Sequence, residues 1–114
     1  MMPVTHKLSS ANKLETSYAG LLELRRRAGE ILAWEFERLT LVLADGTRYT
    51  PDFLVVFSDH FEIHETKGFW RDDARVKIKV AATIFPWFRF VGVERKKGAW
   101  HYEQFEPHAS AVMT

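Results

Sequence analysis

The order in which helical and strand-like patterns follow one another limits this chain to few folds. Ser9 and Ser10 are suited to cap a helix that continues to about Ala28, where Gly29 would end it. Strands are expected over residues 31–43, 48–57, 61–67, 88–94 and 99–105, and a second helix over residues 72–85. The resulting order αβββαββ predicts an α/β fold of one domain, with a mixed central sheet flanked by helices.

Turn and breaker residues support these boundaries. Asp45-Gly46 predicts a hairpin turn between the first two strands. Pro51, inside the second strand, indicates an edge strand or an irregular segment, because proline cannot donate to the strand ladder. Pro86 limits the second helix to about Phe85. Residues 107–114 are small and polar, and we expect them to form a flexible tail.

Length and composition exclude several classes of protein. The chain has 114 residues, of which 46% are hydrophobic, which is enough for a single buried core. It has no cysteine, so a metal would be held by oxygen or imidazole ligands, which favours Mg²⁺ or Mn²⁺. The N-terminus lacks the apolar core of a signal peptide, and no apolar run approaches the roughly 18 to 20 residues that cross a bilayer. We therefore expect an intracellular protein that does not associate with membranes.

An aspartate directly after a proline, followed by Glu-x-Lys on a later strand, is the pattern that carries chemistry. Alternate residues of a strand share a face, so Glu65 and Lys67 point the same way and His64 points oppositely. The hairpin between the two motifs can place Asp52 on the neighbouring strand. Two carboxylates at one place repel unless a cation separates them. The pattern therefore predicts a divalent metal site beside a lysine. Such a site can catalyse the cleavage of phosphodiester bonds.

Each part of this pattern also has a simpler interpretation. Glu-x-Lys on a strand is most often a pair of solvated charges, and Pro-Asp is most often part of a turn. The combination is more specific, and a helical glutamate adds to it. At about 100° per residue, Glu15 lies at the border of the apolar stripe formed by Tyr18 and Leu22, whereas Glu23 is expected to face solvent. Glu15 is thus the third acidic candidate.

These residues together resemble the signature of the PD-(D/E)XK nuclease superfamily. Pro51-Asp52 and Glu65-Thr66-Lys67 match its motif, and Glu15 has the position of the acidic residue on its first helix. More closely, residues 15–31, 49–53 and 65–68 are similar to small phage-encoded nucleases that are themselves similar to Holliday-junction resolvases of the endonuclease-I type. The resemblance spans most of the chain, from about residue 12 to residue 95.

The resemblance implies a restriction-endonuclease-like fold over residues 1–114 and a metal-dependent endonuclease. In that family arrangement Asp52 and Glu65 would bind Mg²⁺, or Mn²⁺ in its place, assisted by Glu15 and by the backbone carbonyl of Thr66. Lys67 would serve catalysis. The expected substrate is branched DNA such as a Holliday junction, and the symmetry of a junction implies a homodimer. No small-molecule cofactor is expected, and the location would be the cytoplasm of a bacterial host.

Positive charge is gathered in clusters although the formal net charge is only +1. Trp70, next to one cluster, could stack on an exposed base. The cations expected to contact DNA are Arg71, Arg75, Lys77, Lys79, Arg95, Lys96 and Lys97. A solvated helix face or loop is the alternative interpretation of these clusters. Two other functions stay open: a nuclease of the same fold that acts on flaps, nicks or plain duplex, and a DNA-binding module without catalysis.

Overall fold

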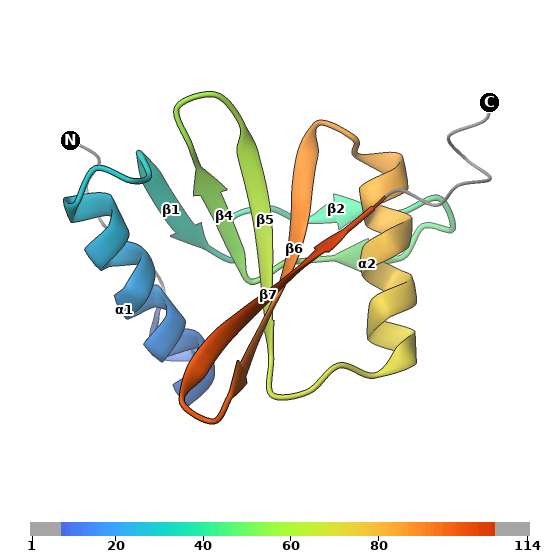
Figure 1. The fold of residues 1–114 in the computed structure, drawn as a ribbon. Helices are drawn as coiled ribbons and strands as arrows, with labels where there is room; N and C mark the ends of the chain where they lie inside the picture. The colour runs from blue at the N-terminus through green and yellow to red at the C-terminus, as the bar shows by residue number, and fades with distance from the viewer. Residues whose placement is uncertain (1–7, 107–114) are drawn as a thin grey trace.

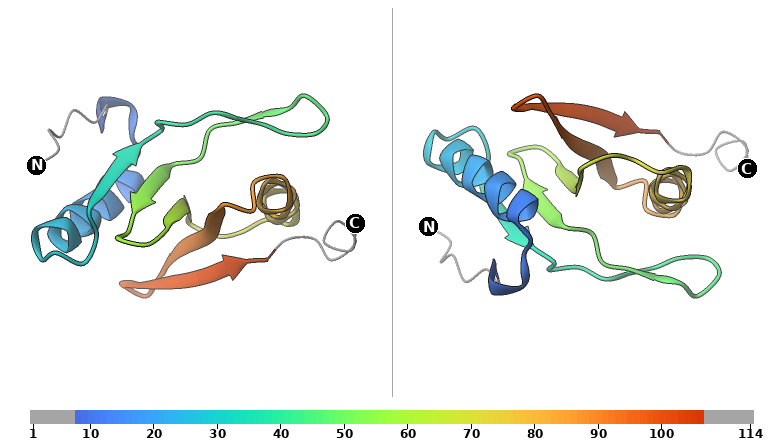
Figure 2. Two further views of the ribbon diagram at one scale, coloured as in Figure 1. Left: turned by 90° about the horizontal axis from the view of Figure 1, so that it is seen from above. Right: turned by 90° about the horizontal axis from the view of Figure 1, so that it is seen from below.

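A mixed five-stranded sheet forms the centre of the protein, with one α-helix on each face (Figure 1 and Figure 2). The structure is a computed structural model, and it describes residues 8–106. The helices are α1 (Lys13–Arg27) and α2 (Asp72–Ile84), and a short 3-10 turn (Leu8–Ser10) precedes α1. The strands are β1 (Ala33–Phe36), β2 (Leu41–Val42), β3 (Arg48–Tyr49), β4 (Phe53–Val56), β5 (Phe61–Lys67), β6 (Phe88–Lys96) and β7 (Ala99–Phe105).

The main sheet has the strand order β1-β4-β5-β6-β7. Strands β5 and β6 are parallel, and the other neighbouring strands are antiparallel. Helix α2 connects the two parallel strands, as a parallel pair requires a crossover. The prediction of a single α/β domain with a mixed sheet is therefore confirmed at that level. The predicted tail, residues 107–114, lies outside the described residues.

Helix α1 begins later than the two serines indicate. Asn12 is its N-cap, since its side chain accepts a hydrogen bond from the Glu15 backbone and the Glu15 carboxylate accepts one from the Asn12 backbone. Ser9 and Ser10 belong to the preceding 3-10 turn instead. The reciprocal capping box satisfies two backbone donors, whereas a serine cap alone satisfies one. The C-terminal prediction is confirmed, because Gly29 follows the helix with a φ of 81°.

Each of the first two predicted strands is broken in two. Strands β2 and β3 pair only with each other as a separate two-stranded sheet, and Asp45-Gly46 forms their turn as predicted. The first strand breaks at Glu37, whose φ is 49°, and the second breaks around Pro51. The β2–β3 hairpin consequently leaves the main sheet and extends on the side of α2, as Figure 2 shows.

The buried side chains form two clusters, one on each face of the sheet. Tyr18, Leu22 and Phe53 are central to the cluster under α1. Ile63 and Ile78 belong to the cluster under α2, together with residues of the hairpin. Ile63 of β5 lies in the cluster under α2, whereas the next residue, His64, contacts Tyr18 of α1, so alternate residues of β5 face opposite sides, as strand parity predicts. Within residues 8–106, neither helix is long and apolar enough to cross a membrane.

Candidate active site

Asp52 and Glu65 lie side by side, and hydrogen bonds link Asp52 to Glu65 and to the following residue, Thr66. The Asp52 backbone N–H donates to Glu65 Oε1 at 3.0 Å. The Thr66 backbone N–H and hydroxyl donate to Asp52 Oδ2 at 2.9 and 2.8 Å. The cause is the register of β4 and β5, which pairs Phe53 with His64 and so brings the preceding residue opposite Glu65. The predicted meeting of the two acids is therefore present.

Neither carboxyl group of this pair ionises as readily as a solvated one. Both side chains are buried. Burial raises the pKa of Asp52 to about 7, with a further upward effect from the charge of Glu65, while hydrogen bonds from Thr66 oppose the rise. Burial also raises the pKa of Glu65, against the opposing hydrogen bond from the Asp52 backbone and the charge of Lys67. Two buried carboxylates that resist ionising together are the donors that a divalent cation stabilises.

The two carboxylates also keep oxygen atoms available for a cation. Both donors to Asp52 act on Oδ2, and Oδ1 receives no hydrogen bond from the described residues. Glu65 Oε2 faces Lys67, whose Nζ lies 3.4 Å away. This contact confirms that Glu65 and Lys67 share a face of β5. The donor set therefore fits a hard divalent cation bound by carboxylate oxygens.

A cleft of about 190 Å³ opens beside Glu65, between β5, the β2–β3 hairpin and α2. Lys67 and Lys77 both line it, so cations from a strand and a helix reach the same space. Lys77 Nζ lies 5.3 Å from the centroid of the Tyr49 ring. The cleft is lined by Tyr49, Thr50, Glu65, Lys67, Trp70, Ala74, Lys77 and Ile78. An anionic group can be held there by two lysines next to Glu65.

Tyr49 belongs to this site, although the sequence assigned it no role. Its hydroxyl donates to Glu65 Oε1 at 3.1 Å. Burial raises the pKa of Tyr49, and the charge of Glu65 raises it further, so the hydroxyl remains a donor. Tyr49 and Asp52 are three residues apart, which would put them on opposite faces of an unbroken strand. The break between β3 and β4 turns both toward Glu65, and the only sequence signal for it was Pro51.

Glu15 does not join the acidic pair. Its Oε1 accepts a hydrogen bond of 2.9 Å from the Asn12 backbone. In the part of the chain that the structure describes, no three Asp, Glu or His side chains are arranged to hold a metal. Beyond the effects of burial and of Glu65, the charge of Glu15 adds a lesser upward effect to the pKa of Asp52. A role for Glu15 as a ligand stays a prediction.

The expectation that Glu23 faces solvent was wrong. Glu23 Oε1 accepts a hydrogen bond of 2.9 Å from the Trp34 indole. Glu23 also binds Arg26 through two hydrogen bonds, of 2.9 and 2.7 Å. This glutamate ties α1 to β1 and lies apart from the acidic pair.

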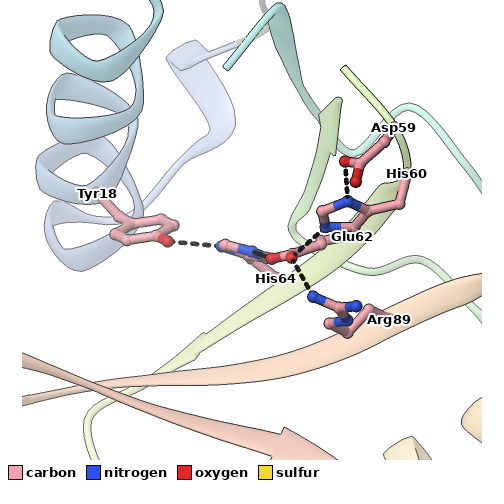
Figure 3. A network of polar contacts seen from close by, with 6 residues as sticks. All are labelled: Tyr18, Asp59, His60, Glu62, His64 and Arg89. Carbon is pink, nitrogen blue, oxygen red and sulfur yellow. Dashed lines mark hydrogen bonds and ion pairs between the residues drawn. The ribbon is translucent and has the colours of Figure 1, made fainter. Parts of the chain in front are cut away.

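His64 faces away from the acidic pair, as strand parity predicts, and belongs to a polar network on the α1 side (Figure 3). Its Nδ1 lies 2.6 Å from the Tyr18 hydroxyl and its Nε2 lies 2.8 Å from Glu62 Oε1. Because a carboxylate only accepts, His64 Nε2 carries the proton, and burial lowers the pKa of His64 so that Nδ1 accepts from Tyr18. Glu62 Oε2 contacts His60 and Arg89. The network ties α1 to β5.

The cations predicted to contact DNA fall into two groups. Three have partners within the protein: Arg75 donates to Glu103 at 2.8 and 2.7 Å, Arg95 donates to Ser17 at 3.0 Å, and Lys96 lies 3.5 Å from Glu94. The others form no ion pair among the described residues and are exposed, although Arg71 lies over the Phe69 ring and Lys77 over the Tyr49 ring; they are Arg71, Lys77, Lys79 and Lys97. Trp70 is half-buried: its ring packs against Phe105, with 5.3 Å between ring centroids, and also lines the cleft.

Comparisons with protein-family models, with curated proteins and with solved structures find no match for this chain. Its function is therefore inferred from the geometry and chemistry of the cleft.

Proposed function

We propose that this protein is a metal-dependent endonuclease that hydrolyses phosphodiester bonds in DNA. The observation that carries the proposal is the buried pair of Asp52 and Glu65, held by hydrogen bonds from the Asp52 backbone to Glu65 and from Thr66 to Asp52, and flanked by Lys67. Burying two like charges destabilises a fold unless a cation balances them. Carboxylates would repel the phosphates of DNA in a protein that only binds it. The pair therefore favours hydrolysis over binding alone.

Asp52 Oδ1 and Glu65 Oε2, the oxygen beside Lys67, are the groups that would hold Mg²⁺, or Mn²⁺ in its place. When bound, the cation supplies positive charge that polarises the phosphate and acidifies the attacking water. Glu15 and the backbone carbonyl of Thr66 are the further ligands that the family resemblance implies. The hydrogen bonds from Thr66 hold the Asp52 side chain in place before any cation arrives.

The two lysines would act on the substrate itself. Lys67 would donate to a phosphate oxygen and stabilise the negative charge that grows as water attacks. Lys77 would hold the same or the neighbouring phosphate from the α2 side of the cleft, which fixes the position of the scissile bond relative to the acids. In the hydrolysis the water oxygen would form a new bond to phosphorus and lose a proton to solvent, while the bond from phosphorus to the leaving oxygen breaks and that oxygen takes up a proton from solvent.

The fold type, the DNA substrate and the oligomeric state are proposed from the resemblance that the same residues carry. We propose a restriction-endonuclease-like fold, in which the segment before β4 and the end of β5 carry the motif and α2 joins the parallel strands β5 and β6. The preferred substrate is a branched DNA such as a Holliday junction, cut by a homodimer in the cytoplasm of a bacterial host. Exposed cations on α2 and at the β6–β7 turn support contact with more than one duplex arm.

A cleavage assay tests this proposal. Asp52→Ala and Glu65→Ala should each lower the rate of cleavage in Mg²⁺ at least about a hundredfold, because each removes a group that holds the cation. DNA binding should persist or tighten, since a negative charge near phosphate is removed. Lys67→Ala should lower kcat by about 10² to 10³. Glu30→Ala, at an exposed acid on the α1 side, is the matched control and should cut normally.

Cleavage assays on two DNA substrates distinguish the alternative functions. A mobile four-way junction and a linear duplex of matched sequence are given to the wild-type protein. Equal cutting of both would remove the junction preference and leave a nuclease for flaps, nicks or duplex. Junction binding without cleavage in Mg²⁺ or Mn²⁺ would indicate a DNA-binding module. Wild-type rates for the Asp52, Glu65 and Lys67 variants would refute the assignment of the site.

A further inference from the structure

The Tyr49 hydroxyl is a buried polar group directed at one oxygen of Glu65. It donates to Oε1 at 3.1 Å, and the tyrosine side chain is almost completely enclosed. Buried hydroxyls need a partner, and most side-chain hydrogen bonds are made to backbone or water. This hydroxyl instead meets the carboxylate of a proposed metal ligand.

Two donors converge on the same oxygen of Glu65. The Asp52 backbone N–H reaches Oε1 at 3.0 Å, beside the Tyr49 hydroxyl. On the other oxygen, Oε2, the described residues place only the ammonium group of Lys67, 3.4 Å away at the edge of the cleft. The carboxylate is thus held by one oxygen and presents the other to the space beside Lys67.

We infer that Tyr49 is a positioning residue that orients the Glu65 carboxylate for a divalent cation, an inference that rests on the proposed metal-dependent function. The terminal torsion of a glutamate is broad and lacks sharp minima, so it is set by hydrogen bonds. The Asp52 backbone donor alone would hold Oε1 but leave the carboxylate free to rotate about that oxygen. The second donor, from another strand, restricts this rotation of the carboxylate. Partners of this kind typically change metal affinity or activity about ten- to a hundredfold.

The position of Tyr49 is rigid enough for this role. Its strand β3 is paired with β2 through Leu41, and its ring packs in the cluster that includes Ile63 and Ile78. Lys77 covers the ring from α2. A donor held from three elements loses little freedom when it binds, which makes it an effective orienting group.

Tyr49→Phe tests the inference, because it removes the hydroxyl and keeps the ring. Tyr18→Phe is the matched control, since it also removes one buried hydroxyl, at 2.6 Å from His64 on the other face of the sheet. Binding of Mn²⁺ to each protein is measured without DNA by titration calorimetry, together with the rise in Tm that saturating Mn²⁺ produces. We expect the Kd for Mn²⁺ to rise about tenfold or more in Tyr49→Phe. The control should keep the wild-type Kd even where its Tm falls.

Cleavage supplies a second measurement. Tyr49→Phe should need more Mn²⁺ for half-maximal cleavage and should regain most of the wild-type kcat at saturating Mn²⁺. A wild type that binds Mn²⁺ and cuts DNA, with an unchanged Kd in Tyr49→Phe, would refute the role of Tyr49 alone. An equal rise of Kd in Tyr18→Phe would also refute it, since any lost buried hydroxyl would then have the same effect. A wild type that binds neither Mn²⁺ nor Mg²⁺ would overturn this inference and the proposed function together.

Discussion

Asp52 is the residue at which stability and the proposed function are opposed. Its pKa is raised from 3.8 to about 7, first by burial and then by the charge of Glu65. A carboxyl group whose pKa is higher in the folded than in the unfolded state stabilises the fold when it is protonated. This contribution is complete below pH 3.8 and is lost as the pH rises through about 7. At pH 8 the metal-free protein therefore contains a buried charge that destabilises it.

Asp52→Asn should remove this opposition. The asparagine oxygen can still accept the hydrogen bonds from Thr66, and no buried charge forms at high pH. At pH 8 with a chelator, we expect the free energy of unfolding to rise by about 1 kcal/mol and its pH dependence between pH 4 and 8 to flatten. Thermal unfolding across this pH range measures both effects, and cleavage should be lost.

Asp45→Asn is the control for this prediction. The pKa of Asp45 is lowered by hydrogen bonds from Thr47 at the exposed hairpin turn, so its contribution has the opposite sign and disappears only as the pH falls below its ordinary value. Stability at pH 8 should therefore not rise in this variant. An Asp52→Asn protein with the pH profile of the wild type would show that Asp52 is already ionised without cost.

One residue of β6, Gly92, lies beside the cleft residue Glu65 of the neighbouring strand β5. The parallel register places Gly92 opposite Glu65. A Cβ at Gly92 would lie 2.6 Å from Phe105 Cε2 and 2.8 Å from Trp70 Cζ2. The glycine therefore provides the space in which two rings lie against the sheet. Trp70 is one of them, and it lines the cleft.

Gly92→Ala should destabilise the fold by about 1 to 3 kcal/mol, because the rings must move to admit the new methyl group. Gly20→Ala is the matched control. Gly20 lies within α1 with nothing within 4 Å of its added Cβ, so alanine should stabilise that helix by up to about 1 kcal/mol. Urea unfolding of both variants gives the two free energies. A Gly92→Ala protein as stable as the wild type would mean that Trp70 and Phe105 are free to shift.

Charge across the whole molecule gives little general attraction to DNA. Its 16 Lys and Arg nearly balance its 15 Asp and Glu, so affinity must come from where the cations lie. Arg75, Arg95 and Lys96 are engaged with partners in the protein. Lys77 is exposed and lines the cleft. The molecule thus presents a few placed cations rather than a uniformly basic surface.

Lys77→Ala should therefore weaken DNA binding and lower the slope of log K against log salt concentration by about 0.9, the value for one lost phosphate contact. Lys79, two positions along α2, is turned by about 200° from Lys77, and its replacement by alanine should change the slope less. Fluorescence anisotropy with labelled DNA at several salt concentrations measures both slopes. Equal changes in the two variants would show that the cleft has no special part in binding.

Local sequence is sufficient for the features that depend on neighbouring residues. The shared face of Glu65 and Lys67 and the opposite direction of His64 follow from strand geometry, which repeats every two residues. The Asp45-Gly46 turn and the end of α2 before Pro86 follow from the backbone limits of those residues. The start of α1 was misplaced for a local reason as well, since the capping box of Asn12 and Glu15 is more favourable than a serine cap alone.

Contacts between segments far apart in the sequence could be identified only from the tertiary structure. The hydrogen bond of Tyr49 to Glu65, the approach of Lys77 to the cleft and the bond of Glu23 to Trp34 depend on strand breaks and on how the hairpin and helices lie against the sheet. The acidic pair was predicted because its two motifs lie on strands joined by one turn. The groups around the acidic pair come from elements whose positions depend on how the whole chain buries its apolar surface. The sequence of a short segment does not determine that burial.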